Sequence, residues 1–404
     1  MRIQAFLLLF ALALHAADRV TVAGSVVDQS TMQPIENATV MVYSAGVKKG
    51  YDLFCPTCYV DCGKRATTDD KGAFRIEGLS PDLVFNLLVV REGYGAAFIK
   101  KVDPAGTPAP SAPLKKRTSP DEPSQVVRGR VINAKGQPVR DAVIAQQGIV
   151  FELGRSFGDR DWIDLVAVSN RDGEFEMAYS KPAKAMILQV EPRGMAPKLA
   201  TLPTGATRQN VTVADGATIR GRLVQNGKPV ANAEFGLSTH SRISGTVFQE
   251  IRIGTNENGE FAITNVPAGR VWDLYARMDS LAPRSLAAEL TYVATKDDGQ
   301  DINVGDIVAR SAYTLRGRIV LSDGAAIPAD MRVSVFGDRI PDRQSLLLPP
   351  DGSFEFKGLA KGVYILSPAV KGYQQQGEQQ LELVVDGDRK DLNVTLYPAK
   401  SPTR

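Results

Sequence analysis

The chain has 404 residues, a formal net charge of +3, and charged residues that make up 23% of the sequence. So small a net charge creates no field that would favour nucleic acid or an acidic membrane surface. Histidine, the usual carrier of general acid–base chemistry, occurs only twice, which argues against a catalytic protein, although carboxylates could replace it.

The first segment has the proportions of an export signal. Arg2 gives a short positive region, Ala5–Leu14 is an unbroken apolar run, and the small residues Ala16 and Ala17 precede charged residues. The apolar run is too short to cross a bilayer, and the pattern predicts a signal peptide over residues 1–17. The protein is therefore expected in the periplasm, on the cell surface or in the medium. The alternative is a buried first strand or helix.

Four similar units follow this leader, and each opens with a strand that carries a central glycine. The opening strands contain Val-Ala-Gly-Ser or a Val/Ile/Leu-Arg-Gly-Arg sequence, at Val22–Ser25, Val127–Arg130, Ile219–Arg222 and Leu315–Arg318. A glycine turn followed by an aromatic residue comes later in each unit, at Phe74, Phe175, Phe261 and Phe354. A period of about a hundred residues is the size of a whole domain and too long for a solenoid repeat.

Short runs rich in Val, Ile, Leu, Phe and Tyr alternate with Gly, Pro, Asp and Asn along the chain. The expected strands include Val20–Val27, Thr39–Tyr43, Val84–Val90, Val126–Ile132, Ala185–Val190, Ala217–Val224, Val271–Ala276, Thr314–Leu321, Met331–Phe336 and Val363–Ala369. This pattern predicts an all-β protein of four tandem seven-stranded Greek-key β-sandwich domains. The best helix candidate is the short segment Ser285–Leu290.

The repeats divide the chain into sandwiches over residues 18–117, 118–213, 214–309 and 310–404. A Pro-rich stretch, residues 104–123, is expected to be stiff and partly extended, although Ala112–Arg117 within it could return as a last strand. The later junctions have almost no linker. The neighbouring domains there are expected to abut with restricted motion.

Each opening strand alternates between two faces, so that its glycine and apolar residues point one way and its arginines the other. The glycine indicates a bulge or a close approach of the backbone. The turn aromatics are expected in the core. The arginine pairs could form a stripe for anionic ligands, or they could pair with carboxylates on the neighbouring strand, which we favour; they are Arg128/Arg130, Arg220/Arg222 and Arg316/Arg318.

The order of these motifs resembles a known family. Strand-Arg-Gly-Arg, Gly-x-Pro-Val-x-Asn-Ala, Thr-x-x-x-Gly-x-Phe and Val-Pro-Ala-Gly follow one another as they do in the carboxypeptidase regulatory-like domain. That family is similar to the transthyretin-like and starch-binding-like seven-stranded sandwiches. The resemblance implies a fold and an accessory role. It implies no reaction, because the chain has no His-x-x-Glu pair and too few histidines for the family's partner zinc enzyme.

The most distinctive segment holds all three cysteines, Cys55, Cys58 and Cys62, in the variable loop of the first unit. An exported chain favours oxidation, and an odd count allows at most one bridge within the chain. A structural disulfide is the favoured interpretation. The alternatives are a metal site that uses Asp61 or another residue as its fourth ligand, thiol redox chemistry activated by nearby basic residues, and a bridge to another chain.

The matching loop of the second unit is the candidate ligand-binding loop. It holds Trp162, Phe157, Asp159, Arg160 and Asp161. Aromatic rings beside charged side chains are typical of sugar-binding faces, because the ring stacks on the sugar and the charged groups bond to its hydroxyls. The more ordinary interpretation is that Trp162 folds back onto its own sandwich. Trp272 follows a turn in an expected strand and is expected in the core.

These patterns together predict an exported, non-catalytic binding, adhesion or spacer protein of the cell envelope. Its expected partner is a polysaccharide or an envelope protein, with no cofactor, no nucleic acid and no membrane span. The alternative is a thiol-redox or metal-binding protein that uses the Cys55, Cys58 and Cys62 loop.

Overall fold

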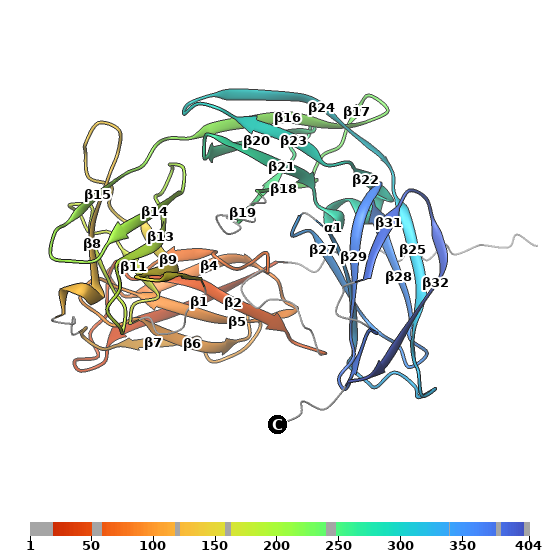
Figure 1. Ribbon diagram of the computed structural model, residues 1–404, viewed down its shortest axis with the longest axis horizontal. Helices are drawn as coiled ribbons and strands as arrows, with labels where there is room; N and C mark the ends of the chain where they lie inside the picture. The colour runs from red at the N-terminus through yellow and green to blue at the C-terminus, as the bar shows by residue number, and fades with distance from the viewer. Residues whose placement is uncertain are drawn as a thin grey trace, which may run out of the picture.

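The structure, a computed structural model, describes residues 19–50, 59–117, 122–157, 163–239, 248–338, 340–376 and 381–399. Over these residues the chain forms four β-sandwiches in succession, each with two sheets around a hydrophobic core (Figure 1). The expected all-β class of tandem sandwiches is confirmed. The leader over residues 1–17 lies outside the described residues. Of the helices in the described parts, none is long and apolar enough to cross a membrane.

In its described residues, sandwich 1 has seven strands, and it gives the plan for the other sandwiches. Its strands are β1 (Val20–Asp28), β2 (Thr39–Val47), β3 (Arg65–Thr67), β4 (Ala73–Leu79), β5 (Leu83–Val90), β6 (Ala97–Val102) and β7 (Ser111–Leu114). One sheet has the order β4-β1-β7, with β1 antiparallel to β4 and parallel to β7. The other sheet has the order β3-β2-β5-β6. Because β7 falls within the Pro-rich stretch, part of that stretch belongs to the sandwich and is not a linker.

The later sandwiches keep this frame and add strands to it. Sandwich 2 contains η1 (Pro123–Gln125), β8 (Val126–Ile132), β9 (Val143–Phe151), β10 (Gly154–Phe157), β11 (Val166–Val168), β12 (Glu174–Ala178), β13 (Ala185–Glu191), β14 (Lys198–Pro203) and β15 (Gln209–Thr212). Sandwich 3 contains β16 (Ala217–Gln225), β17 (Lys228–Pro229), β18 (Glu234–Ser238), β19 (Phe248–Gly254), β20 (Glu260–Val266), β21 (Arg270–Ala276), α1 (Met278–Leu281), η2 (Ala282–Arg284), β22 (Leu286–Ala288), β23 (Thr291–Thr295) and β24 (Asp301–Ser311). Sandwich 4 contains β25 (Tyr313–Leu321), β26 (Arg332–Gly337), β27 (Arg343–Leu347), β28 (Ser353–Leu359), β29 (Gly362–Ala369), β30 (Tyr373–Gln374), β31 (Leu381–Val385) and β32 (Arg389–Pro398).

The opening strand occupies the same place in every sandwich. In the order of the chain, the opening strands β8, β16 and β25 each pair antiparallel with the strand that carries the turn aromatic, β12, β20 or β28. On its other side each pairs in parallel with the last main strand, β15, β24 or β32. The repeated motif of the opening strand therefore lies in a strand with a partner on each side in one sheet of every sandwich.

The short segment Ser285–Leu290, the best helix candidate in the sequence, forms no helix. That segment contains strand β22, whose Leu286 pairs with Ser311 of β24, and the short helix α1 lies before it. Pairing with a neighbouring strand outweighs the weak helix preference of so short a segment.

The repeated glycine and the repeated phenylalanine are direct partners across two strands. The register pairs Gly24 with Phe74, Gly129 with Phe175, Gly221 with Phe261, and Gly317 with Phe354. A Cβ atom added at Gly129 would lie 2.1 Å from Cζ of Phe175. Glycine recurs in this place because the aromatic ring lies over its backbone. All four rings are buried, as expected, at 2%, 6%, 4% and 7% exposure.

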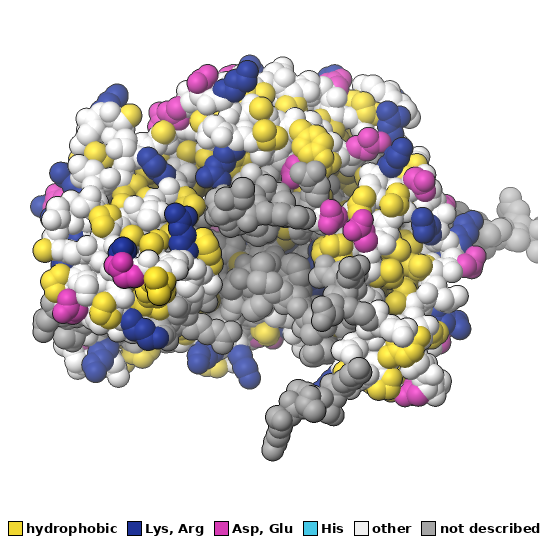
Figure 2. Space-filling view, in the orientation of Figure 1, with side chains coloured by type: hydrophobic (Ala, Val, Ile, Leu, Met, Phe, Trp, Pro, Cys, Tyr) yellow, Lys and Arg dark blue, Asp and Glu magenta, His cyan; other side chains and the backbone are white. Residues whose placement is uncertain are grey.

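Five of the six paired arginines of the opening strands bind carboxylates beside them, as favoured from the sequence. Arg128 pairs with Glu176 of β12, and Arg316 pairs with Glu355 of β28. Four further contacts belong to this set: Arg220–Asp301, Arg222–Asp306, Arg318–Asp351, and a hydrogen bond from Arg130 to the Asp172 carbonyl. These arginines therefore bind groups of their own sandwich. Figure 2 shows Lys and Arg mixed with Asp and Glu over this face of the molecule.

The four sandwiches form an arch in which the fourth returns to the first (Figure 1). A small apolar cluster joins sandwiches 1 and 2; it consists of Met41, Leu88, Val90, Val143 and Val166. The ion pair Arg65–Glu191, at 3.0 Å, adds to that junction. Between sandwiches 3 and 4, the side chain of Met278 belongs to the core of sandwich 4, and its backbone N–H donates to Asp342 at 2.7 Å.

Candidate functional site

Most of the site residues expected from the sequence lie outside the described residues. These are Cys55, Cys58, Asp159, Arg160, Asp161 and Trp162. Cys62 is partly buried and packs against the core of sandwich 1. Phe157 ends strand β10 with 51% of its surface exposed. The cysteine site and the candidate ligand-binding loop therefore stay predictions. Trp272 is fully buried, as expected.

A cavity of about 540 Å³ lies where sandwiches 1, 3 and 4 meet, and we call it the junction cavity. Sandwich 1 contributes the end of β2 and the segments around Tyr59–Asp61 and Ser80–Leu83. Sandwich 3 contributes Arg277 and Asp279, and sandwich 4 contributes β27 and neighbouring residues. Its volume lies within the range of small-molecule pockets, which often form between domains.

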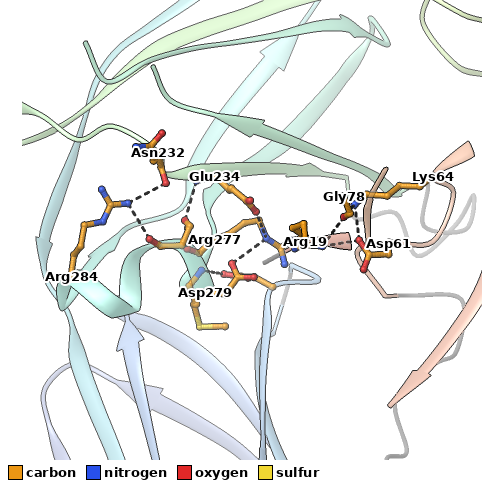
Figure 3. A network of polar contacts seen from close by, with 12 residues as sticks. Arg19, Asp61, Lys64, Gly78, Asn232, Glu234, Arg277, Asp279 and Arg284 are labelled. Atoms are coloured by element: carbon orange, nitrogen blue, oxygen red, sulfur yellow. Dashed lines mark hydrogen bonds and ion pairs between the residues drawn. The ribbon is translucent and has the colours of Figure 1, made fainter. Parts of the chain in front are cut away.

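Asp61 anchors the wall from sandwich 1. Its side chain is 1% exposed, and its Oδ1 accepts from Arg19 at 2.9 Å and from Lys64 at 2.7 Å. Its Oδ2 accepts the backbone N–H of Ser80 at 2.9 Å. Lys64 also donates to the carbonyl of Gly78, which fixes both loops (Figure 3). Both carboxylate oxygens are thus engaged, and Asp61 is poorly placed to be a fourth metal ligand.

Arg277 forms the wall from sandwich 3. Its side chain is 3% exposed, and its Nε lies 3.4 Å from Asp279 and 3.7 Å from Glu234. Figure 3 shows the Arg277 group beside the Asp61 group, and Arg277, Asp279 and Asp61 all line the junction cavity. A guanidinium so deeply buried needs its charge compensated, and the two carboxylates provide this. The position of the positive charge is therefore fixed.

Sandwich 4 closes the cavity by contacts with sandwich 1. Arg332 donates from Nη1 to the carbonyl of Lys49 at 3.0 Å, and from Nε to Ser345 at 3.0 Å. The guanidinium of Arg343 lies 5.6 Å from the ring centre of Tyr59, in the range of a cation–π contact. These contacts join residues from opposite ends of the chain, so the junction cavity exists only while the arch is closed.

No protein-family model and no curated protein matches this sequence. Among solved structures, an ancillary pilin of Streptococcus is 13% identical with a TM-score of 0.24, and the match covers 69% of this chain and 100% of the pilin. The minor pilin GBS52 of Streptococcus agalactiae is 13% identical with a TM-score of 0.25, covering 47% and 99%. The TIE protein of Bacillus anthracis is 12% identical with a TM-score of 0.20, covering 95% and 75%. Likenesses this weak carry no argument about function.

The junction cavity combines positive charge with apolar and aromatic surface. Of its described lining residues, five are Lys or Arg and three are Asp, an excess of two positive charges. The ring of Tyr59 and the side chains of Leu83 and Leu347 add apolar surface. Such a lining can bind a ligand that has both an apolar face and a negative group. In the described ranges, no group of three or more His, Cys, Asp or Glu side chains is arranged to hold a metal ion.

A second cavity, of about 290 Å³, lies between sandwiches 1 and 2 and is crossed by ion pairs. Arg117 binds Asp164 at 2.6 Å and Glu176 at 3.1 Å, and Glu176 also binds Arg128 at 3.0 Å. Burial raises the pKa of Asp164, and Arg117 opposes that rise. Since these side chains bind one another, this cavity is the better candidate for a structural joint than for a ligand site.

Sequence reasoning did not find the junction cavity. Its lining comes from parts of the chain that are far apart in sequence, and the contact between Arg332 and Lys49 alone joins residues 283 positions apart. Neither residue belongs to a repeated motif. The one available signal was the unusual cysteine loop in the first unit, since Tyr59 and Asp61 lie between Cys58 and Cys62.

Proposed function

We propose that this chain is an exported, non-catalytic binding protein of the cell envelope whose four sandwiches act together as one body. Export is supported by the apolar run Ala5–Leu14 and the small residues after it. The repeated motifs support placing each sandwich with the carboxypeptidase regulatory-like domains. The proposed partner is an envelope polysaccharide or protein.

The observation that carries the proposal is the return of sandwich 4 to sandwich 1 (Figure 1). A spacer holds its ends apart, and a row of domains does so best when each touches only its neighbours. Here the first and last domains are in contact, and a cavity of ligand size lies between them. This arrangement favours binding over spacing.

The thiol or metal alternative gains no support from the described residues. Cys62 packs against the core of sandwich 1, and both oxygens of Asp61 are already bound. Tyr59, Val60 and Asp61 then serve to shape one wall of the cavity.

The test is co-sedimentation of the purified mature protein with insoluble envelope material from its own cells, before and after that material is treated with protease. Saturable binding in either condition supports the proposal, and loss on protease treatment assigns the partner to protein. If no saturable binding occurs in either condition, the binding proposal is wrong.

A further inference from the structure

We propose that the junction cavity binds a short acidic oligosaccharide, with a sugar carboxylate held by the lysine and arginine side chains. This inference rests on the proposed binding function and names the ligand class for one site. Nothing in the repeated motifs points to it. It comes from the way three sandwiches bring their side chains together.

Lys49 is the residue best placed to bind a ligand carboxylate. Its Nζ lies 3.9 Å from Asp330, and the two side chains are 72% and 53% exposed. A contact so long and so open to solvent contributes little, so the ammonium group can exchange it for a ligand at small cost. Lys48, in contrast, is held at 2.5 Å by Asp103. The guanidinium of Arg332, held by the Lys49 carbonyl and by Ser345, adds positive charge to the same lining, whereas that of Arg277 is compensated by Asp279 and Glu234.

The acidic residues of the lining narrow the ligand class further. Asp82 and Asp279 line the cavity together with the cations. These carboxylates repel a compact polyanion such as phosphate, but they accept hydrogen bonds from hydroxyl groups. With an excess of only two positive charges, the lining suits a ligand that carries few negative charges and many hydroxyls. A uronic-acid sugar has this composition.

The apolar part of the lining suits the C–H face of a sugar ring. Tyr59 of sandwich 1 and Leu347 of sandwich 4, which is 42% exposed, both line the cavity. Apolar C–H faces pack on aromatic and aliphatic surface while hydroxyls bond at the edges. Because the two residues come from sandwiches 1 and 4, a bound sugar would touch both and stabilise the closed arch.

The test is calorimetric titration of the full mature protein with trigalacturonate. The controls are two sugars that lack a free carboxylate, the methyl ester of trigalacturonate and maltotriose. We expect saturable binding of trigalacturonate and a loss of about tenfold or more with the ester, since a charge-assisted contact is removed. The variant Lys49→Ala should weaken trigalacturonate binding by about tenfold and leave the fold unchanged, because the side chain is exposed. Lys135→Ala, on an exposed turn of sandwich 2, is the matched control and should bind as the unaltered protein does.

Three outcomes would overturn the inference: no saturable binding of trigalacturonate, equal affinity for the uncharged sugars, or equal loss in the two lysine variants. Displacement of the sugar by millimolar phosphate or by a triglutamate peptide at equal affinity would also overturn it, since the site would then select charge alone. The envelope experiment separates this failure from that of the proposed function. If Lys49→Ala still binds envelope material as tightly as the unaltered protein, the binding function stands and the junction cavity is not its site.

Discussion

The pairing of Gly129 with Phe175 gives a sharp test of the repeated motif. An alanine Cβ at position 129 would lie 2.1 Å and 2.3 Å from Cζ and Cε1 of Phe175, which is far inside van der Waals contact. The ring must move from a packed core, and overpacking of this kind costs about 1–3 kcal/mol. Phe175→Ala removes a buried ring and costs about 3–5 kcal/mol. All three nearest atoms belong to that one ring, so Phe175→Ala also removes the clash.

The double variant Gly129→Ala/Phe175→Ala should therefore be less destabilised than the sum of the single variants, by at least about 1 kcal/mol. Hydrogen exchange measured on peptides from β8 and β12 of the full chain reports the opening free energy of sandwich 2 alone. The matched control is Gly317→Ala/Phe354→Ala. There the new Cβ would also lie 2.2 Å from the backbone oxygen of Leu392, which removal of the ring does not relieve. If the effects at 129 and 175 add within about 0.5 kcal/mol, the ring does not explain the glycine.

Three further predictions follow from contacts elsewhere. Hydrogen bonds, the strongest from the Ser30 hydroxyl, hold the pKa of Asp28 well below its ordinary value of 3.8. The stability that this carboxylate gives sandwich 1 is complete above about pH 4 and is lost as the pH falls. In Asp28→Asn, the urea midpoint of unfolding should therefore fall less steeply with decreasing pH than in the unaltered protein. An unchanged pH dependence of the midpoint would contradict this. Trp272 donates from Nε1 to the Pro267 carbonyl and to Thr295. Trp272→Phe should therefore lower the opening free energy of sandwich 3, measured by hydrogen exchange in β21, by about 2 kcal/mol. No change would show that these hydrogen bonds are absent. A zero-length carbodiimide should link Lys49 to Asp330, found as one joined peptide by mass spectrometry, and an open arch would give none.

The sequence was sufficient for the sandwiches because each is specified by local alternation and turns. All ten of the strands named from sequence are formed, with ends that differ by a few residues. The glycine and the phenylalanine were recognised as two separate motifs, and only the strand register shows that they are one contact. The helix candidate Ser285–Leu290 contains a strand instead, because β24, which lies further along the chain, pairs with it.

The arrangement of the sandwiches could not be predicted in the same way. The closure between Arg332 and Lys49 depends on the angles at three successive junctions, and no short pattern in the sequence encodes an angle. The junction between sandwiches 1 and 2 shows why. Met41 and Val143 look like ordinary strand residues, yet both are buried in the cluster between the two domains.

Small-angle X-ray scattering of residues 18–404 in dilute solution tests the central claim, the closed arch, most directly. A compact chain of this length has a radius of gyration of about 21 Å, and the arch should stay below about 30 Å. Four sandwiches in line would instead give about 40 Å. A value below 30 Å, unchanged between low and physiological salt, is the result we predict; a value near that of the extended row would show that sandwich 4 does not return to sandwich 1 and that no junction cavity forms.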